Sequence, residues 1–189
     1  MAPRVDRRAQ IIAATIEVIA REGVAGATFA RIREHARLSS TRLISYHFDS
    51  KEALLQAVLQ HVIGQAGEVM SPVIAAARSP REKLAAYIRS NLAFLAERPD
   101  YARTAVAVLA AGTAAADSTT DQAEDLLVSL FLDAQRDGVM RSFDAPTFAA
   151  TVRAAIDSTV TRFAHSPQLD LVACGEQLVD LFDRAVRPD

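Results

Sequence analysis

The stretch TFARIREHARLSSTRLISYHFDSKEAL, residues 28–54, decides the fold of this chain. Thr28 is a good N-cap for a short helix, and Phe29 and Ile32 follow it at helical spacing. The hydroxyls of the Ser-Ser-Thr run at 39–41 can cap a second short helix, and a third helix begins directly after that one. The pattern therefore predicts two short helices around a tight turn.

The second short helix, which ends near Phe48, carries most of the polar side chains of the stretch. Two helices this short bury little apolar surface, so they must pack on a neighbour and leave one side in solvent. That side offers Ser, Thr, Arg, Tyr and His, the residue types that bind phosphates and base edges. The stretch thus predicts a helix-turn-helix unit that binds DNA, with Arg42 and Tyr46 in the groove. Thr41 and Ser45 would be their shorter partners.

The stretch also resembles the N-terminal DNA-binding region of the tetracycline-repressor (TetR) family of bacterial regulators, over roughly residues 7–60. That family shows a Thr opening the second helix, a Ser at the start of the recognition helix, an apolar-x-x-aromatic/His-Phe ending, and a Lys-Glu-x-Leu start to the fourth helix. The matching residues here are Thr28, Ser39 or Ser40, Ile44 with His47 and Phe48, and Lys51-Glu52-Ala53-Leu54.

Two departures from the family pattern concern the turn between the short helices. The usual Gly of the turn is Arg37 in this chain. The segment from Leu38 to Phe48 is also one residue longer than the common spacing. We place the extra residue in the turn, which leaves open which of the hydroxyls at 39–41 points into the groove.

The predicted DNA contacts combine the geometry of the short helix with this resemblance. The resemblance implies phosphate contacts for Thr28, His47 and Lys51, the last of which lies at a helix N-terminus. The complete set of predicted DNA-binding residues is Thr28, Ser39, Ser40, Thr41, Arg42, Ser45, Tyr46, His47 and Lys51. The alternative is that these are ordinary exposed polar residues on a small helical bundle.

The charge distribution favours DNA as a partner, although the net charge of the chain is −2. Residues 1–51 hold nine Lys and Arg against five Asp and Glu, a balance of +4. The remainder holds twelve against eighteen, a balance of −6. A basic N-terminal part on an acidic remainder is expected when one end of a molecule meets phosphate. Chance clustering of solvated charges is the alternative.

The composition indicates an all-helical protein in a reducing compartment. Half of the 189 residues are hydrophobic, only 6% are aromatic, and Gly and Pro are scattered singly. The single Cys excludes an intramolecular disulfide. No apolar run approaches the ~18 residues that span a bilayer, and the polar N-terminus does not resemble a signal peptide. We therefore expect a cytoplasmic protein with no membrane partner.

Periodicity along the rest of the chain predicts an all-α fold of about nine helices. It comprises an N-terminal three-helix head with the helix-turn-helix, and a C-terminal helical body for ligand binding and dimerisation. We expect residues 1–50 to form the DNA-binding domain and residues 51–189 the effector-binding and dimerisation domain. The predicted helices outside the short motif are 5–22, 50 to at least 67, 80–97, 100–112, 121–137, a helix capped by Asp144, and 169–186, with a polar loop at 113–120.

The last two helices are the predicted dimer interface. One helix-turn-helix reads a single half-site, so such proteins usually dimerise on palindromic DNA. Apolar stripes on these two helices could form a four-helix bundle with a second copy, and the resemblance places the dimer there. The predicted dimerisation residues are Val152, Ile156, Val160, Phe163, Leu178, Leu181 and Phe182. The alternative is that these stripes form the core of the chain itself.

The middle helices would hold a small-molecule effector. Polar residues amid apolar faces are the candidates for contacts, and aromatic residues are the candidates for walls. The scarcity of charge within 101–112 favours a mostly apolar molecule. The predicted effector-binding residues are Tyr87, Asn91, Phe94, Tyr101, Thr104, Phe131, Gln135, Phe148 and Thr151.

The sequence lacks the common catalytic and metal-binding signatures. It has no G-x-S-x-G, no H-E-x-x-H, no Gly-rich phosphate loop and no Cys pair. We therefore predict no enzymatic activity, no catalytic residues, no metal and no cofactor.

Taken with the resemblance, these features predict a transcriptional regulator, with repression favoured because the family is mostly repressors. It would bind a palindromic operator as a homodimer and be released by its effector. The alternatives are a helical-bundle carrier or enzyme with a vestigial head, and a TetR-like activator.

Overall fold

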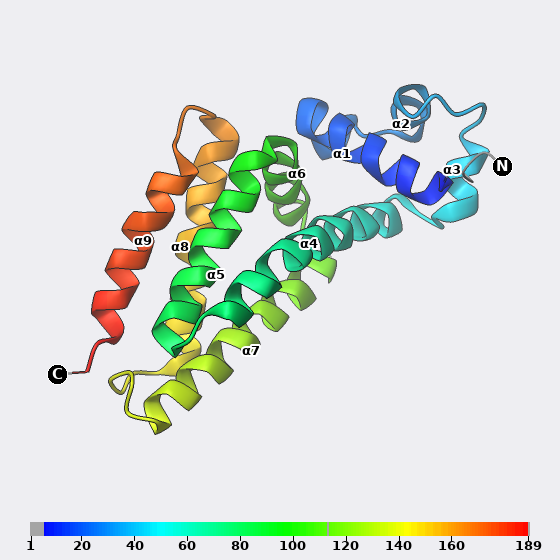
Figure 1. The fold of residues 1–189 in the computed structure, drawn as a ribbon. Coiled ribbons are helices and arrows are strands. Elements are labelled where there is room, and N and C mark those ends of the chain that lie inside the picture. The colour runs from blue at the N-terminus through cyan, green and yellow to red at the C-terminus, as the bar shows by residue number, and fades with distance from the viewer. Residues whose placement is uncertain (1–5, 113, 189) are drawn as a thin grey trace.

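The computed structural model describes residues 6–112 and 114–188, which form nine helices joined by short turns (Figure 1). This confirms the predicted all-α fold. The helices are α1 (Arg7–Gly26), α2 (Phe29–His35), α3 (Arg42–His47), α4 (Lys51–Ala76), α5 (Pro80–Glu97), α6 (Pro99–Ala110), α7 (Ala114–Arg136), α8 (Ala145–His165) and α9 (Leu171–Val186).

Local sequence signals account for most of the helix ends. A Ser, Thr or Asp side chain accepts a hydrogen bond from the first turn of six helices, because the first N–H groups of a helix lack partners within it. These caps are Asp6, Thr28, Ser50, Ser79, Asp144 and Asp170. Gly23 has φ 71° and interrupts α1, as predicted from the sequence, although helical residues resume after it as far as Gly26.

The head consists of α1, α2 and α3 at one end of the elongated molecule (Figure 1). Ile11, Ile32 and Ile44 each contribute a fully buried side chain to its core. The same core includes Leu54 and Val58 of α4, which are also fully buried. The long helix α4 therefore begins as part of the head and continues into the body, where it lies between α5 and α7 (Figure 1).

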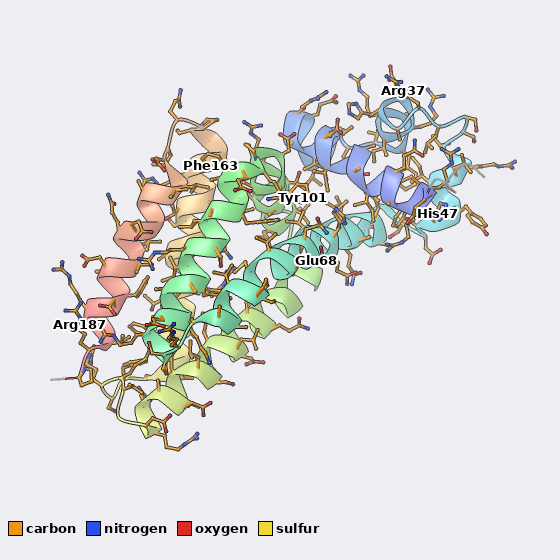
Figure 2. All side chains as sticks on the ribbon, in the orientation of Figure 1. Arg37, His47, Glu68, Tyr101, Phe163 and Arg187 are labelled. Atoms are coloured by element: carbon orange, nitrogen blue, oxygen red, sulfur yellow. The ribbon has the colours of Figure 1, made fainter. Side chains whose placement is uncertain are left out.

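Helix α6 of the body also packs against the head core. Val108 of α6 is fully buried in the same apolar cluster as α1 and α4. The Thr104 hydroxyl donates a 3.1 Å hydrogen bond to the Ile16 carbonyl of α1, and both groups are buried. Tyr101, at the start of α6, packs against the head core and the body core alike. Figure 2 shows Tyr101 where the two parts meet.

The body core is formed by α5 to α9. Leu84, Ile88 and Leu92 of α5 are almost completely buried in it, together with Phe131 of α7. Phe131 belongs to a cluster of edge-to-face and tilted aromatic rings with centroids 4.4–5.6 Å apart, which joins α7, α8 and α9. The other members of that cluster are Phe143, Phe148 and Phe182.

One element differs from its prediction. The expected polar loop at 113–120 is wrong from residue 114 onward, because α7 begins at Ala114; residue 113 lies outside the described residues. Three consecutive Ala at 114–116 have high helix propensity, and this outweighs the Ser and Thr that follow.

Within the described ranges, no helix is long and apolar enough to cross a membrane.

Ion pairs fasten α9 to α5. Arg81 donates two hydrogen bonds of 2.8 and 2.6 Å to Oδ1 of Asp183, and Arg187 donates to Oδ2. Arg89 and Glu176 form a bidentate pair with both distances at 2.7 Å. Burial raises the pKa of Asp183, but the hydrogen bonds from Arg187 and Arg81 outweigh it and leave the pKa below its ordinary value.

Asp183→Asn should therefore lower the free energy of unfolding by about 1 kcal/mol at neutral pH. A carboxylate with a lowered pKa stabilises the fold above its unfolded-state pKa and ceases to do so as the pH falls through its folded pKa. The difference between wild type and variant in urea unfolding should thus shrink below about pH 4. Asp180→Asn, which loses only the exposed pair with Arg184, is the control and should change little. A deficit independent of pH would indicate a steric effect instead.

Candidate DNA-binding interface

The turn between α2 and α3 covers residues 36–41. Ser40 lies one residue before Thr41, the N-cap position of α3, and its Oγ accepts a 3.1 Å hydrogen bond from the Arg42 backbone N–H. Ser39 is exposed beside it, and Thr41 makes no capping bond through its side chain. This geometry assigns different positions to the three hydroxyls that the sequence left equivalent.

The outward face of α3 carries Arg42, Ser45 and Tyr46, all of them exposed. The Tyr46 side chain is 83% exposed, although aromatic side chains are usually largely buried. Two apolar side chains hold α3 against the head core. Ile44 is fully buried, and Phe48 at the end of the helix is 3% exposed. Burial of this apolar pair directs the three polar side chains into solvent, where a DNA groove would meet them.

The other predicted contacts surround this face, and two of them also serve the fold. Thr28 is exposed and caps α2 by accepting from the Arg31 N–H at 3.3 Å. His47 is half-buried with its ring edge toward Tyr46, the centroids 5.2 Å apart. Lys51 Nζ donates a 2.6 Å hydrogen bond to the Val24 carbonyl, which joins the start of α4 to the end of α1. Figure 2 shows His47 at the head end of the molecule.

Two arginines near the motif were absent from the predicted contacts. Arg33 on α2 and Arg37 in the turn are exposed, and neither they nor Arg42 forms an ion pair among the described residues. By contrast, Arg31 lies 3.4 Å from Glu22 and 3.8 Å from Glu34. The unpaired arginines account for much of the positive excess of the head. The charge count detected that excess but could not assign it to positions.

Arg37 adopts a backbone conformation that normally requires glycine. Its φ is 51°, the one positive φ among the described residues other than glycine. The turn enforces this conformation, because the Leu38 N–H donates to the Arg33 carbonyl at 2.9 Å. Gln10 Nε2 of α1 also donates to the Ala36 carbonyl at 2.8 Å. The left-handed conformation that the family pattern assigns to Gly is therefore retained here despite the substitution.

The structure distributes the predicted effector residues over several places. Phe94 and Tyr101 pack edge to face between α5 and α6, whereas Phe131 and Phe148 belong to the aromatic cluster of α7, α8 and α9. Tyr87 faces α8, where its hydroxyl accepts from Arg153 at 2.9 Å. Asn91 is half-buried on α5. The five aromatic candidates nevertheless belong to the one apolar cluster of the body core.

Three of the polar candidates are engaged elsewhere, which corrects their prediction as pocket residues. Thr104 is fully buried and bonded to α1, as described above. Gln135 donates to the carbonyls of Arg141 and Phe143 and so braces the turn before α8. Thr151 lies on the exposed side of α8 and donates to the Thr147 carbonyl of its own helix.

Five of the predicted dimerisation residues are also corrected, because they form intrachain core. Their side chains are 0–6% exposed, so a second copy cannot reach them without unfolding the body. They are Val152, Ile156, Val160, Phe163 and Phe182. Leu178 is half-buried and packs against the same core. Leu181 is 58% exposed on the outer side of α9 and remains available to a partner.

Comparison with known proteins identifies the head. Residues 11–58 match the family described as "Bacterial regulatory proteins, tetR family". The match covers the head and the start of α4, about a quarter of the chain. Among curated tetR-like relatives, the HTH-type transcriptional regulator BetI of Paraburkholderia phytofirmans is 40% identical over 86 residues. That match covers 45% of this chain and 44% of BetI, so it spans less than half the length of the relative.

Solved structures of similar fold extend over nearly the whole chain. The regulator FadR from Bacillus subtilis, solved in complex with stearoyl-CoA, has a TM-score of 0.85 at 24% identity, covering 95% of this chain and 99% of its own. AibR, solved in complex with isovaleryl coenzyme A and operator DNA, has a TM-score of 0.73 at 20% identity, covering 97% and 99%. At these identities the likeness establishes the fold of head and body together.

The positive φ of Arg37 leads to a stability prediction. Arg37→Gly should raise the free energy of unfolding by about 1 kcal/mol, because glycine adopts a positive φ without the steric cost of a Cβ. Arg37→Ala is the control, since it removes the same charge but keeps the Cβ and should give no such gain. Chemical denaturation of the two variants measures the difference. Equal stabilisation by both would attribute the effect to charge and not to the backbone.

Proposed function

We propose that this chain is a ligand-responsive transcriptional regulator that binds palindromic operator DNA as a homodimer in the cytoplasm. The observation that carries the proposal is the exposed face of α3. Arg42, Ser45 and Tyr46 lie free in solvent there, on a head whose sequence matches the tetR family. The match with the regulator BetI, 40% identical over 86 residues, supports transcriptional control and not catalysis.

In this proposal, α3 enters the major groove and the surrounding polar groups bind phosphate. Arg42 is suited to a guanine edge, because its guanidinium can donate two parallel hydrogen bonds. Thr28, Ser39 and His47 would contact the backbone, as would the exposed Arg33 and Arg37. We retain residues 1–50 as the DNA-binding unit and 51–189 as the unit for effector binding and dimerisation. The start of α4 then serves both, since its apolar side chains complete the head core.

The dimer is proposed to form through the outer faces of α8 and α9. On α8 that face carries small residues that allow close approach of another helix. They are Ala150, Thr151, Ala154, Ser158 and Thr161, all exposed. On α9 the exposed apolar side chain is Leu181, at 58%, whereas Val172, at 52%, lies nine residues away and so on the opposite side of the helix. This face replaces the buried one predicted from the apolar stripes.

An effector in the body is proposed to release the DNA by shifting the population of head positions. Helix α6 bonds to α1 through Thr104, and α4 runs from the body into the head core. A ligand that displaces either helix changes the spacing of the two recognition helices in the dimer. Repression relieved by the ligand follows from this coupling. The fold neighbours FadR and AibR were solved with acyl-CoA ligands, which supports a small effector with a mostly apolar part.

The DNA-binding proposal is tested with the double variant Arg42→Ala, Tyr46→Ala. A DNA fragment is first selected by the wild-type chain from a random-sequence pool, and it should contain a palindrome. The double variant should bind this fragment at least tenfold more weakly, because each lost base contact costs about 1–3 kcal/mol. Fluorescence anisotropy over a range of salt concentrations measures the affinity and its salt dependence.

The matched control is Arg136→Ala, which removes an exposed arginine from α7 in the body. It should bind like the wild type. Unchanged affinity of the double variant would refute the assignment of α3 as the recognition helix. Failure of the wild type to select any sequence would favour the alternative, a helical-bundle carrier or enzyme with a vestigial head. An activator would bind the same palindrome but raise transcription in a reporter assay.

The dimer proposal is tested with Leu181→Arg. A charge at the centre of an apolar interface leaves an unpaired group on association, so this variant should be monomeric in sedimentation velocity. It should also bind the palindrome more weakly than the wild type. Leu126→Arg is the control, because Leu126 is 74% exposed but lies on α7. A monomeric Leu126→Arg with a dimeric Leu181→Arg would place the interface on α7 instead.

A further inference from the structure

Arg8 of α1 lies beside the C-terminal end of α3. Its guanidinium is positioned over the ring of Phe48, with Cζ 5.3 Å from the ring centroid. Phe48 directly follows the last residue of α3 and is 3% exposed, whereas Arg8 is exposed. The first residues of α1 lie next to α3 in Figure 1. The first helix thus places a positive charge at the end of the proposed recognition helix.

The cation–π contact restrains this side chain without using its hydrogen-bond donors. A cation over an aromatic face is attracted by the electrons of the ring. A guanidinium also carries five N–H donors that lie in its own plane. None of those of Arg8 has a hydrogen-bond or ion-pair partner among the described residues. Arg8 therefore presents a charge that is held in place and whose donors are unused.

Two carboxylates lie near Arg8 or Phe48 in the chain, and neither pairs with this guanidinium. Asp6 Oδ1 accepts from the backbone N–H groups of Arg8 and Ala9, at 3.0 and 3.2 Å, and so serves as the N-cap of α1. Asp49 is exposed and forms no ion pair among the described residues. The charge of Arg8 is thus available to a partner outside the chain.

Uncompensated arginines are concentrated in the head. Most arginines of the body are paired with carboxylates, as Arg81 is with Asp183. Four exposed arginines of the head have neither an ion pair nor a side-chain hydrogen bond among the described residues, and they are Arg8, Arg33, Arg37 and Arg42. Arg42 is the first residue of α3, and Arg8 lies at the other end of that helix. Uncompensated charges therefore flank α3 at both ends.

The dimensions of the major groove bring such a charge close to phosphate. A helix with its side chains is about 10–12 Å across, and the groove is about 12 Å wide. A helix that enters the groove therefore fills it, and the groups beside the helix face the sugar–phosphate walls. Arginine suits a phosphate because its planar N–H groups can donate two parallel hydrogen bonds.

We propose that Arg8 binds a phosphate of the DNA backbone at the C-terminal end of α3, and that the Phe48 ring holds its guanidinium in position for this contact. The inference rests on the proposed function, because it adds a contact to the same DNA interface. Phosphate contacts position a protein on the duplex but do not read the sequence. Arg8 thus contributes affinity and salt dependence, whereas Arg42 contributes the choice of sequence.

The experiment uses Arg8→Met in the full-length chain, because methionine keeps an unbranched apolar stem against Phe48 and removes the charge. Fluorescence anisotropy measures binding to the palindrome selected by the wild type and to a scrambled fragment, between about 50 and 200 mM salt. At the lowest salt concentration, the variant should bind both fragments at least tenfold more weakly than the wild type.

The salt dependence is the decisive measurement. One phosphate contact adds about 0.9 to the slope of log affinity against log salt concentration, so the two contacts of a dimer add about 1.8. The wild type should therefore lose about twelvefold more affinity than Arg8→Met over this fourfold range of salt. The ratio of the affinities for the palindrome and the scrambled fragment should change less than twofold. Arg42→Ala should instead lower that ratio at least tenfold.

Two control variants separate charge from position. Arg8→Lys should keep the slope of the wild type and restore most of the affinity, because an ammonium group also neutralises a phosphate. Arg21→Met makes the same substitution about 20 Å further along α1, where Arg21 is exposed and lies 3.9 Å from Glu17. It should leave affinity and slope unchanged. Urea unfolding of each variant measures its stability.

Three results would overturn the inference. Arg8→Met could bind with the affinity and slope of the wild type. Its loss could be confined to the palindrome, which would make Arg8 a base contact. It could also bind weakly with an unchanged slope and a lower stability in urea, which would make the contact with Phe48 purely structural. Each result leaves selection of the palindrome by the wild type unaffected, whereas failure of that selection would refute the proposed function.

Discussion

The head depends on apolar surface that it does not itself provide. Helices α2 and α3 have seven and six residues, and each contributes one fully buried isoleucine. Helices this short are unstable alone, so their stability must come from packing. Besides α1, the helices α4 and α6 contribute to the same core, through Leu54, Val58 and Val108 among others. The DNA-binding unit is therefore held in shape by two helices that also belong to the body.

This shared core provides a physical basis for the proposed regulation. A DNA-binding unit with a complete core of its own could move on a linker independently of the body, and ligand binding in the body would not affect it. Here the hydroxyl of Thr104 bonds to a carbonyl of α1, and Tyr101 packs against both cores. If α6 moves, either these contacts break or α1 moves with it, because packed interiors deform little. A movement of α6 in the body is thus transmitted to α1 and the rest of the head through direct contact.

The same logic separates the predictable part of the site from the rest. Arg42, Ser45 and Tyr46 could be assigned to the outward face of α3, because the helical period fixes them opposite Ile44. The dimer face could not be assigned in this way. An apolar stripe on α8 shows that one side of the helix is buried against another surface. It does not show whether that surface belongs to α7, to α9 or to a second copy of the chain. The structure shows intrachain cover for Val152 and Ile156, so the proposed dimer face is the exposed side of α8 with its small residues.

The sequence by itself determined the all-α class, most helix ends and the helix-turn-helix with its basic surroundings, because these follow from capping, period and charge within short windows. Only the tertiary structure decided which side chains each helix buries against another. It showed that Lys51 bonds to the Val24 carbonyl, that Arg37 takes a left-handed conformation, and that Arg8 lies over the Phe48 ring. These depend on residues distant in the chain or on the geometry of a closed turn, and no local pattern records them.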